Sequence, residues 1–192
     1  LAALLQTTLF VAAAPLFTNW VIRVKCTLQN RLPPPWSQPY RDLRRLFAKE
    51  VLLARTASLV FRIAPYIVCG TTILAAAIIP LVWINIPFTA MADAIVLVGT
   101  LALGRFFLAL AGMDVGTSFG GMGSSREMTF AALAEPAMLI VVFTLAMLSS
   151  STNLSTIIAY VLSQPLAVRP SLLFGLLSLI LVGIVETGRI PV

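Results

Sequence analysis

The chain consists mainly of long apolar segments with very little charge. Residues 1–22 have no charged side chain, and comparable apolar segments follow at 63–84, 91–113, 128–148 and 171–187. At 1.5 Å per residue, about 20 helical residues cross a hydrocarbon core of about 30 Å. The sequence therefore predicts an all-α, polytopic transmembrane protein with about five spans in a single membrane domain, residues 1–192.

The charge content and its distribution support a membrane protein over a soluble one. Only 10% of the residues are charged, whereas soluble domains carry about 25%. The formal net charge is +6, but the Lys and Arg residues gather at the ends of apolar segments. A nucleic-acid-binding protein would instead present them on one polar face. We therefore expect contact with a lipid bilayer and no nucleic-acid partner.

The residues that usually hold metals are scarce. The chain has no histidine and only two cysteines, Cys26 and Cys69. Haem ligation by histidine, a histidine-based zinc site and a disulfide framework are therefore not expected. The sequence predicts no metal site, no catalytic residue and no cofactor bound by this chain.

One basic segment, residues 23–62, holds nine of the 13 Lys and Arg residues. Its three prolines, at 33–35, predict extended backbone. From 37 to about 53 the spacing predicts an amphipathic helix lying in the membrane interface. Glu50 falls near the middle of its apolar face. That face also carries Tyr40, Leu43, Leu46, Phe47, Val51 and Ala54, and the opposite face carries Arg41, Asp42, Arg44, Arg45 and Lys49.

The positive-inside rule places this basic segment in the cytoplasm. Alternation of the spans then puts the N-terminal residues outside, the turn at 85–90 outside and residues 149–170 outside. Residues 114–127, whose glycine content predicts a loop rather than a helix, fall inside together with 186–189. All the motif-like polar segments are thus predicted to meet on the cytoplasmic face.

Ionisable residues also occur within the predicted spans. A charged residue at the centre of a membrane helix costs roughly 2.5–3.5 kcal/mol on insertion scales. Arg105 and Glu135 are both predicted about 10–12 Å below the cytoplasmic surface, where they can form an ion pair. The pair is either a structural clamp between helices or part of a proton path or polar cavity open to the cytoplasm. Further carboxylates predicted near that surface are Glu50, Asp114, Glu127 and Glu186.

Three segments carry a family resemblance. LQNRLPPPWSQPYRDLRRLFAKE at 28–50, FGGMGSSREMTFAALAEPAM at 119–138 and ETGRIPV at 186–192 resemble the three cytoplasmic signatures of the complex I subunit 1 family. They are most similar to its hydrogenase branch, the membrane subunits of formate hydrogenlyase and hydrogenase-4. The resemblance covers the whole chain, but family members have more spans than the five predicted here. It therefore implies that the sequence is incomplete at its C-terminal end.

The resemblance implies a non-catalytic subunit in the cell inner membrane that anchors a soluble electron-transfer arm. Iron–sulfur clusters and a nickel–iron centre would belong to the partner subunits, the hydrogenase large and small subunits, with antiporter-like membrane subunits as further partners. Glu50, Glu135 and Glu186 match motif positions and would be coupling carboxylates, with Asp114, Glu127 and Arg105 as further proton-coupling candidates. The soluble arm would dock on Arg31, Tyr40, Arg41, Asp42, Arg44, Arg45, Lys49, Arg126 and Arg189.

Two other functions remain open. The chain could be subunit 1 of a quinone-reducing NADH–quinone oxidoreductase, in which case quinone would be a ligand. The quinone-reducing branch has a carboxylate at the start of the first loop, however, and here Val21, Ile22 and Arg23 lack one. An independent transporter is the third class, and the basic segment suited to docking argues against it.

The predicted topology can be tested by cysteine labelling. A membrane-impermeant thiol reagent added outside should modify single cysteines placed at 85–90, because this turn is predicted outside. It should not modify cysteines at Ser124 or Ser125, which are predicted in the cytoplasm. The opposite labelling pattern would show that the orientation is wrong.

Overall fold

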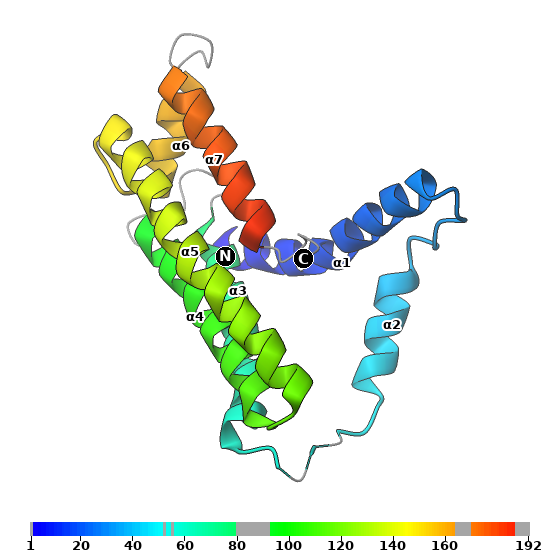
Figure 1. Cartoon of the computed structure of the whole chain (residues 1–192). Helices are drawn as coiled ribbons and strands as arrows, with labels where there is room; N and C mark the ends of the chain where they lie inside the picture. The colour runs from blue at the N-terminus through cyan, green and yellow to red at the C-terminus, as the bar shows by residue number, and fades with distance from the viewer. Residues whose placement is uncertain (1, 52, 55, 80–92, 164–169, 187–192) are drawn as a thin grey trace. The chain divides into compact units, whose positions relative to one another are not determined.

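The computed structural model describes residues 2–51, 53–54, 56–79, 93–163 and 170–186. Within these ranges every regular element is an α-helix, so the predicted all-α fold is confirmed (Figure 1). The helices are α1 (Ala2–Leu28), α2 (Gln38–Phe47), α3 (Leu59–Ile78), α4 (Ala94–Asp114), α5 (Ser118–Ser149), α6 (Leu154–Ser163) and α7 (Pro170–Glu186).

Within the described residues, four helices are long and apolar enough to cross a membrane, namely α1, α3, α4 and α5. The fifth predicted span corresponds to α7, whose 17 residues extend about 25 Å. That length is short of a typical hydrocarbon core. Helix α6, in the segment 149–170, was not predicted. The polytopic class is confirmed, and the turn predicted at 85–90 lies outside the described residues.

The chain forms two compact units, Leu1–Leu53 and Ala54–Val192, each of which is described by itself. The first unit contains α1 and α2, and the second contains α3 to α7. The single membrane domain expected from the sequence stays a prediction.

In the first unit, side chains of α1 hold the proline segment. The Asn19 side-chain amide donates to the Pro35 carbonyl over 3.1 Å, and Arg23 Nε donates to the Pro34 carbonyl over 2.9 Å. The Arg23 guanidinium also lies 4.4 Å from the centroid of the Trp36 ring. Helix α1 ends at Leu28, past the end predicted for the first span, and the chain then turns back so that the extended segment lies beside these donors.

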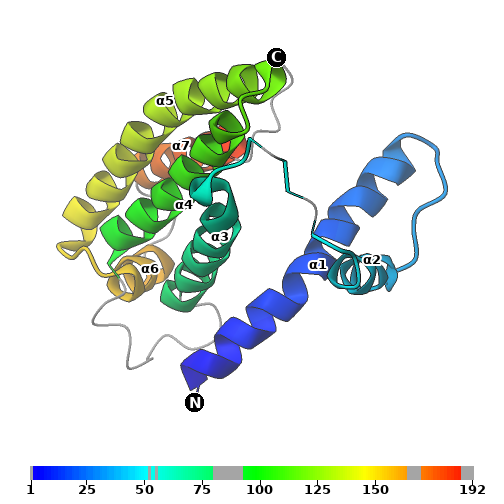
Figure 2. The same ribbon diagram turned by 90° about the horizontal axis from the view of Figure 1, so that it is seen from below.

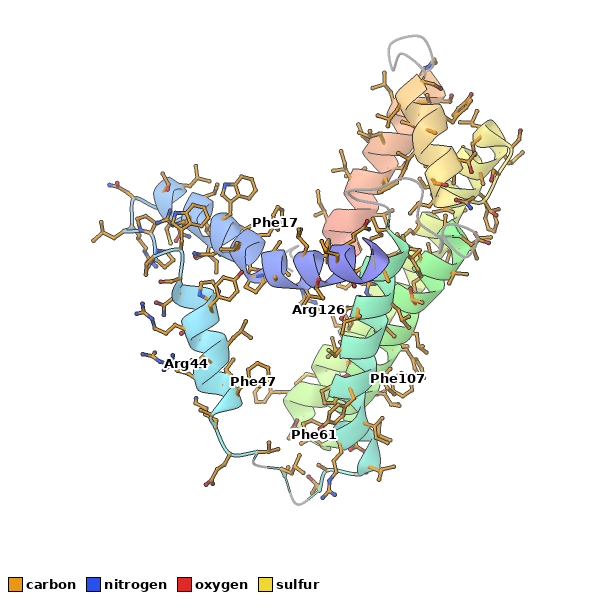
Figure 3. All side chains as sticks on the ribbon, turned by 180° about the vertical axis from the view of Figure 1, so that it is seen from behind. Phe17, Arg44, Phe47, Phe61, Phe107 and Arg126 are labelled. Atoms are coloured by element: carbon orange, nitrogen blue, oxygen red, sulfur yellow. The ribbon has the colours of Figure 1, made fainter. Side chains whose placement is uncertain are left out.

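Helix α2 is shorter than predicted. The amides of Ala48 and Lys49 donate to carbonyls three residues earlier, at 3.3 and 3.2 Å, so the last turn tightens and the ladder of i→i−4 bonds stops. Glu50 therefore follows the helix and does not project from its apolar face, so that prediction was wrong. For residues 38–47 the amphipathic pattern holds, because helical spacing puts Tyr40, Leu43 and Phe47 on one side of α2 and Arg41 and Arg45 on the other. Figure 3 labels Arg44 and Phe47 on this helix.

In the second unit, α4 lies between α3 and α5 (Figure 2). Glycines make the close approaches. A Cβ on Gly104 would lie 2.7 Å from the Thr71 hydroxyl, and one on Gly112 would lie 2.5 Å from the Ser124 hydroxyl. A Cβ on Gly120 would lie 2.4 Å from the Gly112 carbonyl oxygen. Small residues thus allow the helices to touch through their backbones, as is usual in membrane bundles.

The glycine-rich segment 114–127 was predicted to be a loop, and this prediction was wrong. Only a short turn containing Gly116 (φ +70°) separates α4 from α5, and Thr117 caps α5 by accepting from the Gly120 amide at 3.2 Å. Glycine has poor helix propensity, but packing overrides it here because Gly120 must approach α4. Helix α5 consequently has 32 residues and a length of about 48 Å, more than the hydrocarbon thickness.

The opposite end of the bundle is joined by backbone contacts and an apolar cluster. The Ala94 amide donates to the Thr152 carbonyl over 3.1 Å, and Asp93 caps α4 by accepting from the Ile95 amide at 3.1 Å. The bond to Thr152 fixes the start of α6 beside the start of α4. The cluster beneath them consists of Ala94, Val98, Val142, Ala146 and Ile157.

The close approach of α4 and α5 can be tested with two adjacent glycines. Gly120→Ala should destabilise the protein by about 1–3 kcal/mol, since the added methyl has to displace the α4 backbone. Gly121→Ala is the matched control, because nothing lies within 4 Å of its Cβ position. The control should be neutral or slightly stabilising. Thermal unfolding in detergent measures both, and equal melting temperatures would contradict the predicted contact.

Candidate functional site

The end of the basic segment and the turn between α4 and α5 lie at the same end of the second unit. Asp114 accepts from the Ser58 amide at 2.8 Å and from the Ser58 hydroxyl at 2.6 Å. The Thr56 hydroxyl donates to the Val115 carbonyl over 3.0 Å. Two of the polar segments predicted to converge are therefore hydrogen-bonded. Asp114 fastens the start of α3 to the end of α4, and its role in proton coupling stays a prediction.

Ionisable residues follow the contact between α4 and α5, which we term the α4–α5 seam. Gly120, Ser124, Glu127 and Ala131 are spaced so that they share one face of α5, and Gly120 and Ser124 contact α4. Glu127 is half-buried, consistent with that position. Glu135 lies eight residues further along α5, about 12 Å deeper along the helix axis.

Glu135 lines an open pocket between α4 and α5 with a volume of about 440 Å³. Among the described residues that line the pocket, Glu135 alone is ionisable. Pro136 follows it and has no N–H, so the helix lacks its own donor to the Ala132 carbonyl in the pocket wall. The pocket thus combines a carboxylate with mostly apolar walls. Its lining residues are Gly99, Ala102, Leu103, Phe106, Met128, Ala131, Ala132 and Glu135.

Arg105 lies at the same depth as this pocket. Gly112 contacts Ser124 and Val98 shares a cluster with Val142. Counting along the antiparallel helices from these two contacts places Arg105 level with residues 131–135 of α5. The structure therefore brings the two predicted partners to one level, and their ion pair stays a prediction.

The end of α7 reaches a similar level. Leu145 lies 3.8 Å from the Cβ position of Gly175, and Leu179 lines a small cavity with Met138 and Val141. Helix α7 therefore runs antiparallel to α5, and its last residue, Glu186, falls near residue 134 along the bundle. This register places the C-terminal end of α7 at the depth of residues 131–135 of α5.

The predicted docking residues divide between the two units. Helix α2 carries Tyr40, Arg41, Asp42, Arg44 and Arg45, and Tyr40 donates a hydrogen bond to the Ala12 carbonyl. The other docking residues are dispersed. Arg31 lies in the loop after α1 and Lys49 lies after α2, and both are exposed. Arg126 is exposed on α5, with its guanidinium 5.8 Å from the Phe130 ring centroid. Arg189 lies outside the described residues.

Sequence analysis missed two residues that organise the first unit, Asn19 and Arg23. Their contact could have been predicted from two features of the sequence. Asn19 and Arg23 are polar and four residues apart near the end of an apolar helix, and the prolines that follow have carbonyls that need hydrogen-bond donors. Sequence analysis also treated Ser124 and Ser125 as equivalent labelling positions. Ser124 is only 5% exposed, so Ser125, which is exposed, is the useful position.

Comparison with known proteins identifies the family. A family model described as NADH dehydrogenase matches residues 1–192. The chain is therefore an all-α membrane protein that belongs to this family, and the predicted resemblance is confirmed.

Two relatives from Escherichia coli (strain K12) indicate the branch. Hydrogenase-4 component C is 34% identical over 193 residues, covering 98% of this chain and 60% of the relative. Formate hydrogenlyase subunit 4 is 31% identical over 188 residues, covering 98% of this chain and 61% of the relative. The chain thus spans about three fifths of the length of these curated relatives.

Proposed function

We propose that this protein is the membrane anchor and coupling subunit of a membrane-bound nickel–iron hydrogenase complex. The complex would be of the formate hydrogenlyase or hydrogenase-4 type. The observation that carries the proposal is the similarity to both hydrogenase relatives over 98% of the chain. The iron–sulfur clusters and the nickel–iron centre would reside in the hydrogenase small and large subunits, and antiporter-like subunits would adjoin the protein in the inner membrane.

Docking of the soluble arm is assigned to the polar side of α2 and to the exposed residues near it in sequence. Arg41, Arg44 and Arg45 lie within five residues of one short helix, so they concentrate positive charge on a small surface. Complementary charge accelerates association and fixes orientation more than it adds affinity. An acidic surface on the soluble arm would therefore be the matching partner.

Coupling is assigned to the α4–α5 seam. Glu135 is assigned the central role, because it lies in a largely apolar pocket at the level of Arg105. Glu127 lies nearer the end of the bundle at which Asp114 binds Ser58. A proton taken up at that end could pass along these carboxylates, with Glu50 and Glu186 as the further coupling candidates.

This assignment requires a defined orientation. The shared end of α3, α4 and α5 would face the cytoplasm, because the basic segment leads directly into α3 and positive residues favour that side. The N-terminal residues would then lie outside. The excess length of α5 would extend into the cytoplasm, where Arg126 is accessible to the soluble arm.

The second candidate function is subunit 1 of an NADH–quinone oxidoreductase or a related energy-converting oxidoreductase. The family description, NADH dehydrogenase, favours it. In that case the protein would contribute to a quinone site. The absence of a carboxylate at residues 21–23 weighs against this alternative, as does the similarity to two hydrogenase-complex subunits.

Isolation of the intact complex distinguishes these candidates. The native protein would be purified from its own membranes in mild detergent through a C-terminal tag on the full-length gene product. We expect nickel, a hydrogenase large subunit and hydrogen uptake activity to copurify. A stoichiometric quinone without nickel would instead establish the oxidoreductase, and purification without any partner subunit would contradict both.

The role of Glu135 can be tested by neutralising it. Glu135→Gln keeps the shape of the side chain but cannot release a proton, so it should lower proton-coupled activity or assembly by about 100-fold, the lower end of general acid–base effects. Arg44→Gln, on the exposed side of α2, is the comparison and should have the smaller effect on coupling. Hydrogen evolution and proton uptake by membrane vesicles measure both, and equal losses would contradict the coupling role.

A further inference from the structure

Hydrogen bonds join the start of α3 to the turn between α4 and α5. The two carboxylate oxygens of Asp114 accept from the Ser58 amide at 2.8 Å and from the Ser58 hydroxyl at 2.6 Å. The Thr56 hydroxyl donates to the Val115 carbonyl over 3.0 Å. We term these three hydrogen bonds the clasp. Ser58 is the N-cap of α3 and Thr117, two residues after Val115, is the N-cap of α5. The clasp therefore lies where the ends of three helices meet.

The position of Asp114 is unfavourable for α4 and favourable for α3. A negative side chain is destabilised by the dipole at the C-terminal end of a helix and stabilised at an N-terminal end. Asp114 is the last residue of α4, but both of its donors belong to the N-cap residue of α3. The Ser58 hydroxyl also accepts from the Val60 amide at 3.2 Å, so one oxygen atom serves the cap and the clasp. The contact with α3 thus explains the aspartate at this position.

The clasp also holds the place at which α5 begins. Only residues 115–117 separate Asp114 from α5, and Gly116 turns the chain there with a φ of +70°. Shortly after this turn, Gly120 lies against the Gly112 carbonyl of α4. Glu127 lies further along the same face of α5. Because the turn is short, a displacement of its first residues would shift this face of α5 along α4.

Asp114 and Glu135 use their carboxylates differently. Both oxygens of Asp114 accept hydrogen bonds within the clasp, and one of the donors is a backbone amide, which serves only as a donor. Glu135 instead lines an open pocket. A carboxylate that relays protons has to exchange hydrogen-bond partners, so Asp114 would have to break the clasp at each transfer. Holding the three helix ends together and carrying protons are therefore competing roles for this side chain.

We propose that Asp114 is a positioning residue for the coupling site and not one of its proton carriers. It holds the start of α3 on the α4–α5 turn. It thereby keeps the first turns of α5, with Glu127, in register with α4. The part of the proposal that concerns coupling rests on the proposed function, whereas the clasp itself does not.

Two substitutions of Asp114 separate the two roles. Asp114→Asn cannot carry a proton but keeps the clasp, because its amide oxygen accepts from the Ser58 amide and its NH₂ group donates to the Ser58 hydroxyl. Asp114→Ala removes the clasp. Asp93→Ala is the matched control, since Asp93 caps the opposite end of α4. The complex would be purified in mild detergent for hydrogen–deuterium exchange, and proton uptake would be measured in membrane vesicles.

We expect amide exchange over residues 113–123 to become about 100-fold faster in Asp114→Ala, because two hydrogen bonds to a charged group are lost and each is worth about tenfold or more. In Asp114→Asn it should change by less than about fivefold, since only the interaction with the helix dipole is lost. Asp93→Ala should leave it unchanged. Proton uptake should be lost in Asp114→Ala and retained in Asp114→Asn with the pH dependence of the native protein.

Loss of proton uptake in Asp114→Asn at a native exchange rate would overturn the proposal, since Asp114 would then be a proton carrier. Native exchange in Asp114→Ala would also overturn it, because the clasp would hold nothing. If Asp114→Ala does not fold, Ser58→Ala removes only the hydroxyl and should speed exchange by about tenfold. If no hydrogenase subunit copurifies, the proposed function fails, and the exchange rates still decide whether the clasp exists.

Discussion

The close approach of α4 and α5 is the contact on which the second unit depends. Gly112 and Gly120 let the two backbones touch, and in lipid such van der Waals packing replaces the hydrophobic effect as the force between helices. The contact also sets the register of the two helices. That register places Arg105 level with Glu135 and opens the pocket beside Glu135, whereas the packing of α3 on α4 brings Asp114 to the hydrogen bonds with Ser58. The candidate site is therefore a consequence of how two glycines pack.

The sequence predicted the class of fold and most spans, because long apolar segments have few alternatives in a membrane. It failed where packing competes with local propensity. Gly120 and Gly121 lower helix propensity equally, so composition indicated a loop, but only the structure shows that Gly120 faces α4 and that the helix continues. The end of α2 was misplaced because Val51 and Ala54 extend the apolar periodicity beyond the last helical hydrogen bond. That error also placed Glu50 on the helix, whereas it follows the helix in the structure.

The candidate site was predictable by residue type but not by partner. An ionisable residue inside an apolar span is costly, so Arg105 and Glu135 could be identified as candidate functional residues from the sequence alone. The role of Asp114 as an acceptor for Ser58 could not be predicted, since the two residues are 56 positions apart and no local pattern links them. Arg23 was considered only as part of the basic segment and as one of the residues 21–23 that lack a carboxylate. Its contacts with the Trp36 ring and the Pro34 carbonyl were not predicted.

The length of α5 has a mechanical consequence. Arg126, on the part that is too long for the hydrocarbon, and Glu135, in the pocket, belong to one continuous helix and are separated by about 13 Å along its axis. The ladder of hydrogen bonds between them lacks the bond to the Ala132 carbonyl, because Pro136 has no N–H. A displacement of the first turns of α5 would therefore be transmitted along the helix as far as residue 132 and taken up as bending at 132–136, beside the acidic group.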